Sequence, residues 1–134
     1  MIELSNTTAQ TVQPGQALTF DAVVLRSGCA EAHRTNSGIV ILRADCAIYE
    51  VHFAANVSGT AAGTVQLSVA LDGEPLAETT VISTVGTAGD LDNVATATLV
   101  RTGCGCCGRV TVVNSGTEPV VVGAGPALFV KRVA

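Results

Sequence analysis

Apolar and polar residues alternate along much of this chain with a period of two, as they do in half-buried β-strands. In residues 49–53 the side chains of Tyr49, Val51 and Phe53 share one face, and the polar residues between them share the other. Residues 65–71 place four aliphatic side chains on one face in the same way. An amphipathic helix would repeat its apolar residues about every 3.6 positions, so this pattern predicts β-structure.

Turn-forming residues separate these alternating segments. Asp72-Gly73 follows residues 65–71 directly and predicts a hairpin turn, because glycine accepts positive φ. Further strands are expected at residues 17–25, 38–42, 79–84, 94–100, 109–113, 120–122 and 127–133. About eight to ten short strands at this spacing predict an all-β fold, an antiparallel two-sheet jelly-roll sandwich.

The length of 134 residues corresponds to one domain. Residues 1–16 are polar and rich in Thr and Gln, and Pro14-Gly15 forms a turn signal near their end. We expect residues 1–16 to be a loosely held N-terminal arm and residues 17–134 to be the jelly-roll domain.

The composition leaves little charge to cover a monomer surface. Charged residues make up 13% of the chain, against about 25% in an average globular domain, while hydrophobic residues reach 48%. The longest apolar stretch, residues 120–130, is interrupted by Gly123, Gly125 and Pro126, whereas a membrane-spanning helix needs about 20 apolar residues. We therefore expect no membrane insertion and predict that part of the surface is buried between copies of the chain.

The charge and the N-terminal residues bear on partners and location. The net charge is −4 and no basic patch occurs, so nucleic acid is not an expected partner. Residues 1–5 have neither a basic nor an apolar segment, so no secretory signal peptide is expected there. If the protein lies on an extracellular surface, we expect it to arrive by another route, such as release on lysis or incorporation into a coat.

Five short segments occur in an order that is typical of one family. They are Leu18-Thr19-Phe20-Asp21, Ile39-Val40-Ile41-Leu42, Ala47-Ile48-Tyr49-Glu50-Val51, residues 65–71 with Asp72-Gly73-Glu74-Pro75-Leu76, and the closing run of residues 128–134. On these segments the chain resembles the tumour-necrosis-factor-like jelly roll. Within that group it is most similar to the C-terminal domain of bacterial collagen-like exosporium glycoproteins, although Ala47 stands where that family usually has glycine.

The resemblance implies a homotrimer about a threefold axis, with apolar residues of the inner sheet buried between subunits. The residues expected to pack the core or the trimer contact are Phe20, Tyr49, Val51, Phe53, Leu67, Val69, Leu128 and Val130.

Cysteine is concentrated in one glycine-rich loop. Cys104, Cys106 and Cys107 lie there, while Cys29 and Cys46 stand alone. Three interpretations remain open for these residues: disulfides within or between chains, unpaired thiols, and a zinc or copper(I) site. The spacing does not match common structural zinc sites, so metal is the least favoured interpretation and no cofactor is expected.

The chain offers little that suggests catalysis. His33 and His52 are the only histidines, and no nucleophile stands in a strand–turn–helix elbow, so we expect no enzyme activity. Asp90, Asp92 and Asn93 form a small acidic loop that is a candidate ligand site.

Two functions follow from these observations. The first is a non-enzymatic structural or adhesion module, the trimeric head of a surface fibre, a spore coat element or a phage virion appendage, in contact with other coat or virion proteins. The alternative is a module that binds a host receptor or a glycan through end loops of the trimer.

Overall fold

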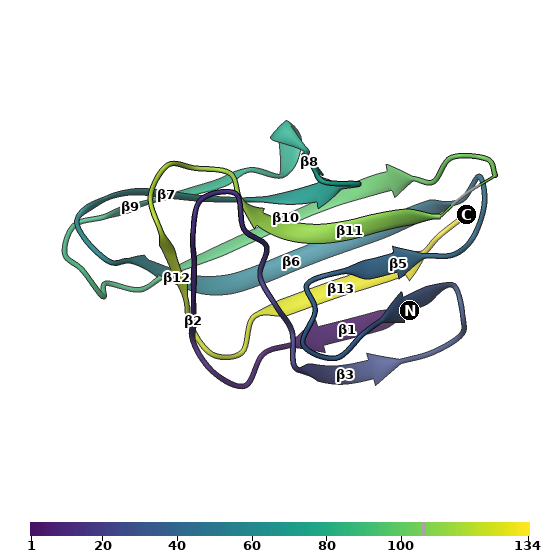
Figure 1. Ribbon diagram of the computed structural model, residues 1–134, viewed down its shortest axis with the longest axis horizontal. Helices are drawn as coiled ribbons and strands as arrows, with labels where there is room; N and C mark the ends of the chain where they lie inside the picture. Colours follow the sequence, from purple (N-terminus) through teal and green to yellow (C-terminus); the bar gives the residue numbers. More distant parts are fainter. Residues whose placement is uncertain (106) are drawn as a thin grey trace.

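Two antiparallel β-sheets packed face to face form the molecule (Figure 1). The computed structural model describes residues 1–105 and 107–134, and no α-helix occurs among them. The fold is the expected all-β two-sheet jelly roll.

Sheet A contains seven strands. These are β1 (Ile2–Ser5), β2 (Gln10–Val12), β3 (Ala22–Arg26), β6 (Ile48–Gly59), β10 (Asp92–Arg101), β12 (Val120–Val122) and β13 (Ala127–Arg132). The long strand β6 organises the sheet, because β10 pairs along one edge while β13 and β12 share the other. Strand β1 then pairs with β13, and β3 closes that side of the sheet.

Sheet B contains six strands. These are β4 (Glu31–His33), β5 (Val40–Leu42), β7 (Gly63–Leu71), β8 (Glu74–Pro75), β9 (Val81–Val85) and β11 (Gly108–Asn114). The central pairs join β11 to β5 on one side and to β7 on the other. The predicted hairpin after β7 is confirmed, since Asp72 and Gly73 have φ of 52° and 86° and Leu71 pairs with Glu74.

The core lies between the two sheets. All eight residues expected to pack the core or the trimer contact are at most 2% exposed within a single chain. They are Phe20, Tyr49, Val51, Phe53, Leu67, Val69, Leu128 and Val130. Since their own chain covers them, they are core residues, and a contact between subunits has to use other side chains.

The N-terminal segment is part of the sandwich. In place of the loosely held arm expected for residues 1–16, the structure has β1 and β2, both paired in sheet A. Ile2 and Leu4 are fully buried, opposite Val130 and Leu128 of β13. The short alternation from Ile2 to Ser5 provides this strand, because every second side chain enters the core.

Two segments differ from the predicted strands. Leu18 and Phe20 are fully buried, but the strand of this region begins only at Ala22. A short 3₁₀ helix, η1 (Ala77–Thr79), occupies the start of the strand expected at residues 79–84, and β9 follows it. Across the described residues, no helix has the length and apolar character needed to span a bilayer.

Candidate functional site

The outward face of sheet A is built from small and apolar side chains. Ala54 of β6 lies between Ala95 of β10 and Ala127 of β13. In the next row His52 lies between Ala97 and Phe129. Figure 1 shows these three strands side by side across the middle of the sheet. We call this set of residues the alanine face.

The alanine face is hollowed. A depression of about 380 Å³ lies over it, lined mainly by the alanines, His52 and Phe129. Phe129 is half-buried and lies between His52 of β6 and Glu3 of β1, and its side chain lines the depression together with the alanines. Such a surface admits close approach of another backbone or side chain.

Charged residues border one end of the alanine face. Glu50 lies between Leu99 of β10 and Lys131 of β13, and Leu99 is 63% exposed. The Nε2 atom of His52 lies 2.6 Å from Oε1 of Glu50. The His52 ring also contacts the Phe129 ring edge-on, with centroids 5.7 Å apart. The face therefore combines an apolar centre with a polar border, which is typical of protein interfaces.

A second apolar patch lies on the edge of the same sheet. Val23, Val24 and Leu25 of β3 are 45%, 60% and 47% exposed. β3 pairs with β1 on one side and ends the strand order of sheet A on the other. An exposed apolar edge strand is a template for contact with another chain. We call residues 23–25 the β3 edge.

Four of the five cysteine candidates lie at one end of the sandwich. Cys46 in the β5–β6 loop and Cys104 in the β10–β11 loop form a disulfide, with Cα atoms 4.7 Å apart. The β3–β4 loop that carries Cys29, and both chain termini, lie at the same end (Figure 1). Cys29 and Cys107 are exposed, and Cys106 lies outside the described residues.

The structure thus assigns Cys46 and Cys104 to an intrachain disulfide. Within residues 1–105 and 107–134, no group of three or more His, Cys, Asp or Glu side chains is arranged to hold a metal ion.

The candidate ligand loop lies at the opposite end. Asp90, Asp92 and Asn93 are exposed. Asp92 accepts a hydrogen bond of 2.9 Å from Ser83 Oγ, and Asn93 donates one of 3.1 Å to Asn56. These contacts hold the start of β10 against β9 and β6, and a ligand role for the loop stays a prediction.

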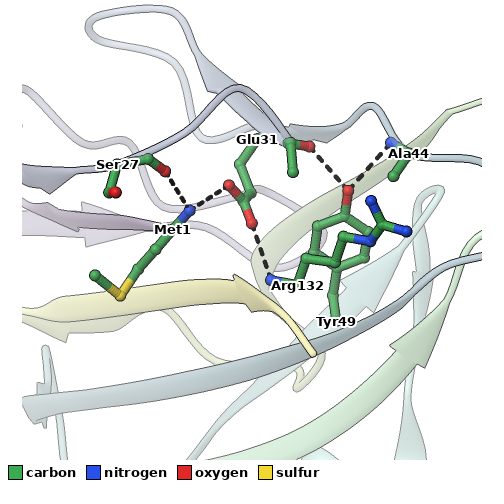
Figure 2. Close-up of polar contacts among 7 residues, drawn as sticks. Met1, Ser27, Glu31, Ala44, Tyr49 and Arg132 are labelled. Atoms are coloured by element: carbon green, nitrogen blue, oxygen red, sulfur yellow. Dashed lines mark hydrogen bonds and ion pairs between the residues drawn. The ribbon is translucent and has the colours of Figure 1, made fainter. Parts of the chain in front are cut away.

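Sequence reasoning missed a buried carboxylate. Glu31 is 1% exposed, and its Oε2 accepts a hydrogen bond of 2.5 Å from the Met1 ammonium group (Figure 2). Its Oε1 accepts one of 3.0 Å from the backbone N–H of Arg132, and the ammonium group also donates to the carbonyl oxygen of Ser27. No local motif marks Glu31, because all its partners are distant in the chain.

Tyr49 forms further buried hydrogen bonds at this end of the sandwich. Its hydroxyl donates to the carbonyl oxygen of Ala30 at 2.9 Å and accepts from the backbone N–H of Ala44 at 3.1 Å (Figure 2). A single fully buried side chain therefore positions both loops beside the disulfide.

The histidines hold structural contacts. The two ring nitrogens of His33 lie 3.1 Å and 3.2 Å from the carbonyl oxygens of Ile39 and Phe20. His52 pairs with Glu50 as described above. These contacts give both rings a packing role.

Comparison with known proteins bears on the fold. No protein-family model matches the chain, and no curated protein matches it. Among solved structures, murine APRIL is similar with a TM-score of 0.67 at 15% identity, covering 98% of this chain and 97% of that one.

Two further structures extend this comparison. Eiger TNF from S. frugiperda has a TM-score of 0.70 at 8% identity, covering 99% of this chain and 91% of that chain. PRD1 vertex protein P5 has a TM-score of 0.54 at 10% identity, covering 99% and 96%. At these identities the likeness establishes the fold.

Proposed function

We infer that this chain, a tumour-necrosis-factor-like jelly roll, is a non-enzymatic building block that assembles as a homotrimer through the outward side of sheet A. The trimer would form the head of a surface fibre, a spore coat element or a virion appendage. The alanine face is the observation that carries this proposal.

The alanine face suits contact with a second copy of the chain. Its centre consists of Ala54, Ala95, Ala97 and Ala127 with Phe129 and His52, and the charged residues Glu50, Lys131 and Glu3 lie around it. Aromatic residues are favoured and charges disfavoured at the centre of interfaces. With 13% charged residues in the whole chain, such burial also accounts for the composition.

The β3 edge supplies the second surface that a closed ring needs. A ring built by rotation joins two different patches, one from each neighbouring subunit. The alanine face and the β3 edge are both apolar and belong to the same sheet, so each subunit offers one of each.

The parent assembly is proposed from the comparison of folds and from the sequence resemblance. The fold likeness to PRD1 vertex protein P5 favours a virion, and the resemblance of the sequence to exosporium glycoproteins favours a spore surface. Peptide mass spectrometry of purified virions and spores from the source organism would distinguish the two. The alternative of receptor or glycan binding through end loops such as residues 90–93 stays a prediction.

Light scattering coupled to size exclusion tests the assembly. At micromolar concentration we expect a mass three times the 13.5 kDa of the chain. Ala97→Glu places a carboxylate beside His52, in the depression that Phe129 also lines, so we expect this variant to be a folded monomer. Ala62→Glu, an equal change in the exposed β6–β7 turn, should remain a trimer.

A monodisperse monomer for the unmodified chain would refute the proposal. So would an Ala97→Glu variant that keeps the trimer mass and a native circular dichroism spectrum.

A further inference from the structure

The outward face of sheet B carries two adjoining hollows of about 310 and 440 Å³. Both are lined by Arg109 of β11 and by Ile39 beside β5. These volumes fall in the range of small-molecule sites, which is about 300–1,000 Å³. The outward face of sheet B lies on the opposite side of the sandwich from the outward face of sheet A, so this region would stay open in the proposed trimer.

The smaller hollow is cationic. Arg34, in the β4–β5 turn, joins Arg109 around a floor of Ile39 and Ile41, and Ser37 adds a hydroxyl group. Among the described residues the ion pairs are those of Met1 with Glu31 and His52 with Glu50, so neither arginine is neutralised there. Two unpaired guanidinium groups on one hollow are notable in a chain with seven basic residues and a net charge of −4.

The chemistry of guanidinium groups indicates the ligand group. The planar fork of N–H donors matches a carboxylate or a sulfate group, and such charge-assisted hydrogen bonds are stronger than neutral ones. An anionic group carried by the ligand would therefore lie between Arg34 and Arg109.

The larger hollow contains hydrogen-bond acceptors. Asp72 and Thr111 line it together with Arg109. Asp72 is held in place, because its Oδ1 accepts a hydrogen bond of 2.9 Å from the backbone N–H of Arg109. A carboxylate and a hydroxyl group beside a cationic hollow suit a ligand that carries one anionic group and several hydroxyl groups.

We propose that these two hollows, the Arg34–Arg109 groove, bind an acidic saccharide that carries one carboxylate or sulfate group per sugar unit. The anionic group contacts the two arginines, and the C–H face of the ring lies on Ile39 and Ile41. Hydroxyl groups of the neighbouring sugar unit donate to Asp72 and Thr111.

The strand pairing disfavours an acidic peptide. β5 is paired on both edges, with β4 and β11, and β11 is paired with β5 and β7. No strand edge is therefore open in the floor for an extended peptide to join. Asp72 would also repel a segment with several acidic residues.

Isothermal titration tests the groove with defined probes. These are an unsulfated uronate-containing disaccharide, its sulfated counterpart, and lactose as a neutral saccharide. We expect millimolar or tighter binding of at least one charged disaccharide and none of lactose. Which charged probe binds identifies carboxylate or sulfate as the recognised group.

Charge-removing variants locate the site. Arg34→Gln and Arg109→Gln should each weaken binding about tenfold or more, because each removes charge-assisted hydrogen bonds. Arg26→Gln removes an equal exposed charge from β3 and should leave the affinity unchanged. The folded monomer expected for Ala97→Glu should bind like the unmodified chain, so failure of the trimer proposal leaves this one standing.

The proposal is overturned if neither charged disaccharide binds, or if both arginine variants bind as tightly as the unmodified chain. It is also overturned if inorganic sulfate or a hexa-aspartate peptide binds as tightly as the saccharide.

Discussion

At the residue scale, the most informative side chains are polar groups held by distant partners. Glu31 joins the Met1 ammonium group to the backbone of Arg132, and Tyr49 joins Ala30 to Ala44. A buried polar group stabilises a fold only when its hydrogen bonds are satisfied. These two residues therefore fix the end of the sandwich where both termini and the disulfide lie.

Asp21 provides a test of hydrogen bonding at an exposed site. Thr7 Oγ1 donates to its Oδ2 at 2.6 Å and the Thr7 backbone N–H donates to its Oδ1 at 2.9 Å. The Thr7 hydroxyl is the main reason that the pKa of Asp21 lies below its ordinary value, and slight desolvation opposes it. A lowered pKa adds stability above the unfolded-state pKa, and this stability is lost as the pH falls through the folded-state value.

We expect Thr7→Val to raise the pKa of Asp21 towards its ordinary value, so that Asp21 contributes less stability above this pKa and less stability is lost on acidification. Carboxyl NMR titration of Asp21 measures the change, with Thr8→Val as a neighbouring exposed control. An unchanged Asp21 pKa in Thr7→Val would contradict the assigned cause.

At the element scale, the Cys46–Cys104 disulfide connects two loops that end adjacent strands of sheet A. The β5–β6 loop precedes β6, and the β10–β11 loop follows β10, and the two cysteines are 58 positions apart in the sequence. Strands β6 and β10 pair along ten residues and together carry much of the alanine face. The disulfide thus closes the end of the strand pair on which the proposed interface depends.

Cys46→Ser should lower the free energy of unfolding by about 2–4 kcal/mol, because the disulfide restricts a long loop of the unfolded chain. Guanidinium denaturation without reductant measures this effect. Cys29→Ser, which removes an exposed thiol outside the disulfide, should unfold like the unmodified chain. Equal stabilities of Cys46→Ser and the unmodified chain would mean that this disulfide does not stabilise the fold.

At the scale of the whole molecule, the two sheets present different surfaces. The outward side of sheet A has an apolar centre with a polar border and the exposed β3 edge at its side, whereas that of sheet B carries the two unpaired arginines. This division suits a ring in which sheet A faces the neighbouring subunits and sheet B faces solvent.

If the β3 edge docks on the alanine face of a neighbour, Val24→Glu should dissociate the trimer as Ala97→Glu does. The reason is the cost of burying an unpaired carboxylate against an apolar surface. Ile82→Glu, an equal change at an exposed residue of β9 in sheet B, should keep the trimer mass in light scattering. A trimeric Val24→Glu variant would mean that the ring uses another edge.

The local pattern of the sequence was sufficient to predict β-strands, the hairpin at Asp72-Gly73 and the residues of the core. These features depend on neighbours in the chain, since alternation decides which side chains share a face. The local pattern did not predict that residues 1–16 contain paired strands. The reason is that Ile2 and Leu4 pair with β13, more than a hundred residues away in the sequence.

The candidate sites were decided by the tertiary structure. The pairing of Cys46 with Cys104, the ion pair of Glu31 with Met1 and the shared hollow of Arg34 and Arg109 all join residues far apart in sequence. The alanine face likewise needs the register of three strands, because its alanines are separate single residues in the chain. Sequence alone was enough to predict an all-β jelly roll, and its low charge predicted a surface buried between subunits. Strand register decided where the candidate for that surface lies, because it brings together residues that are far apart in the chain.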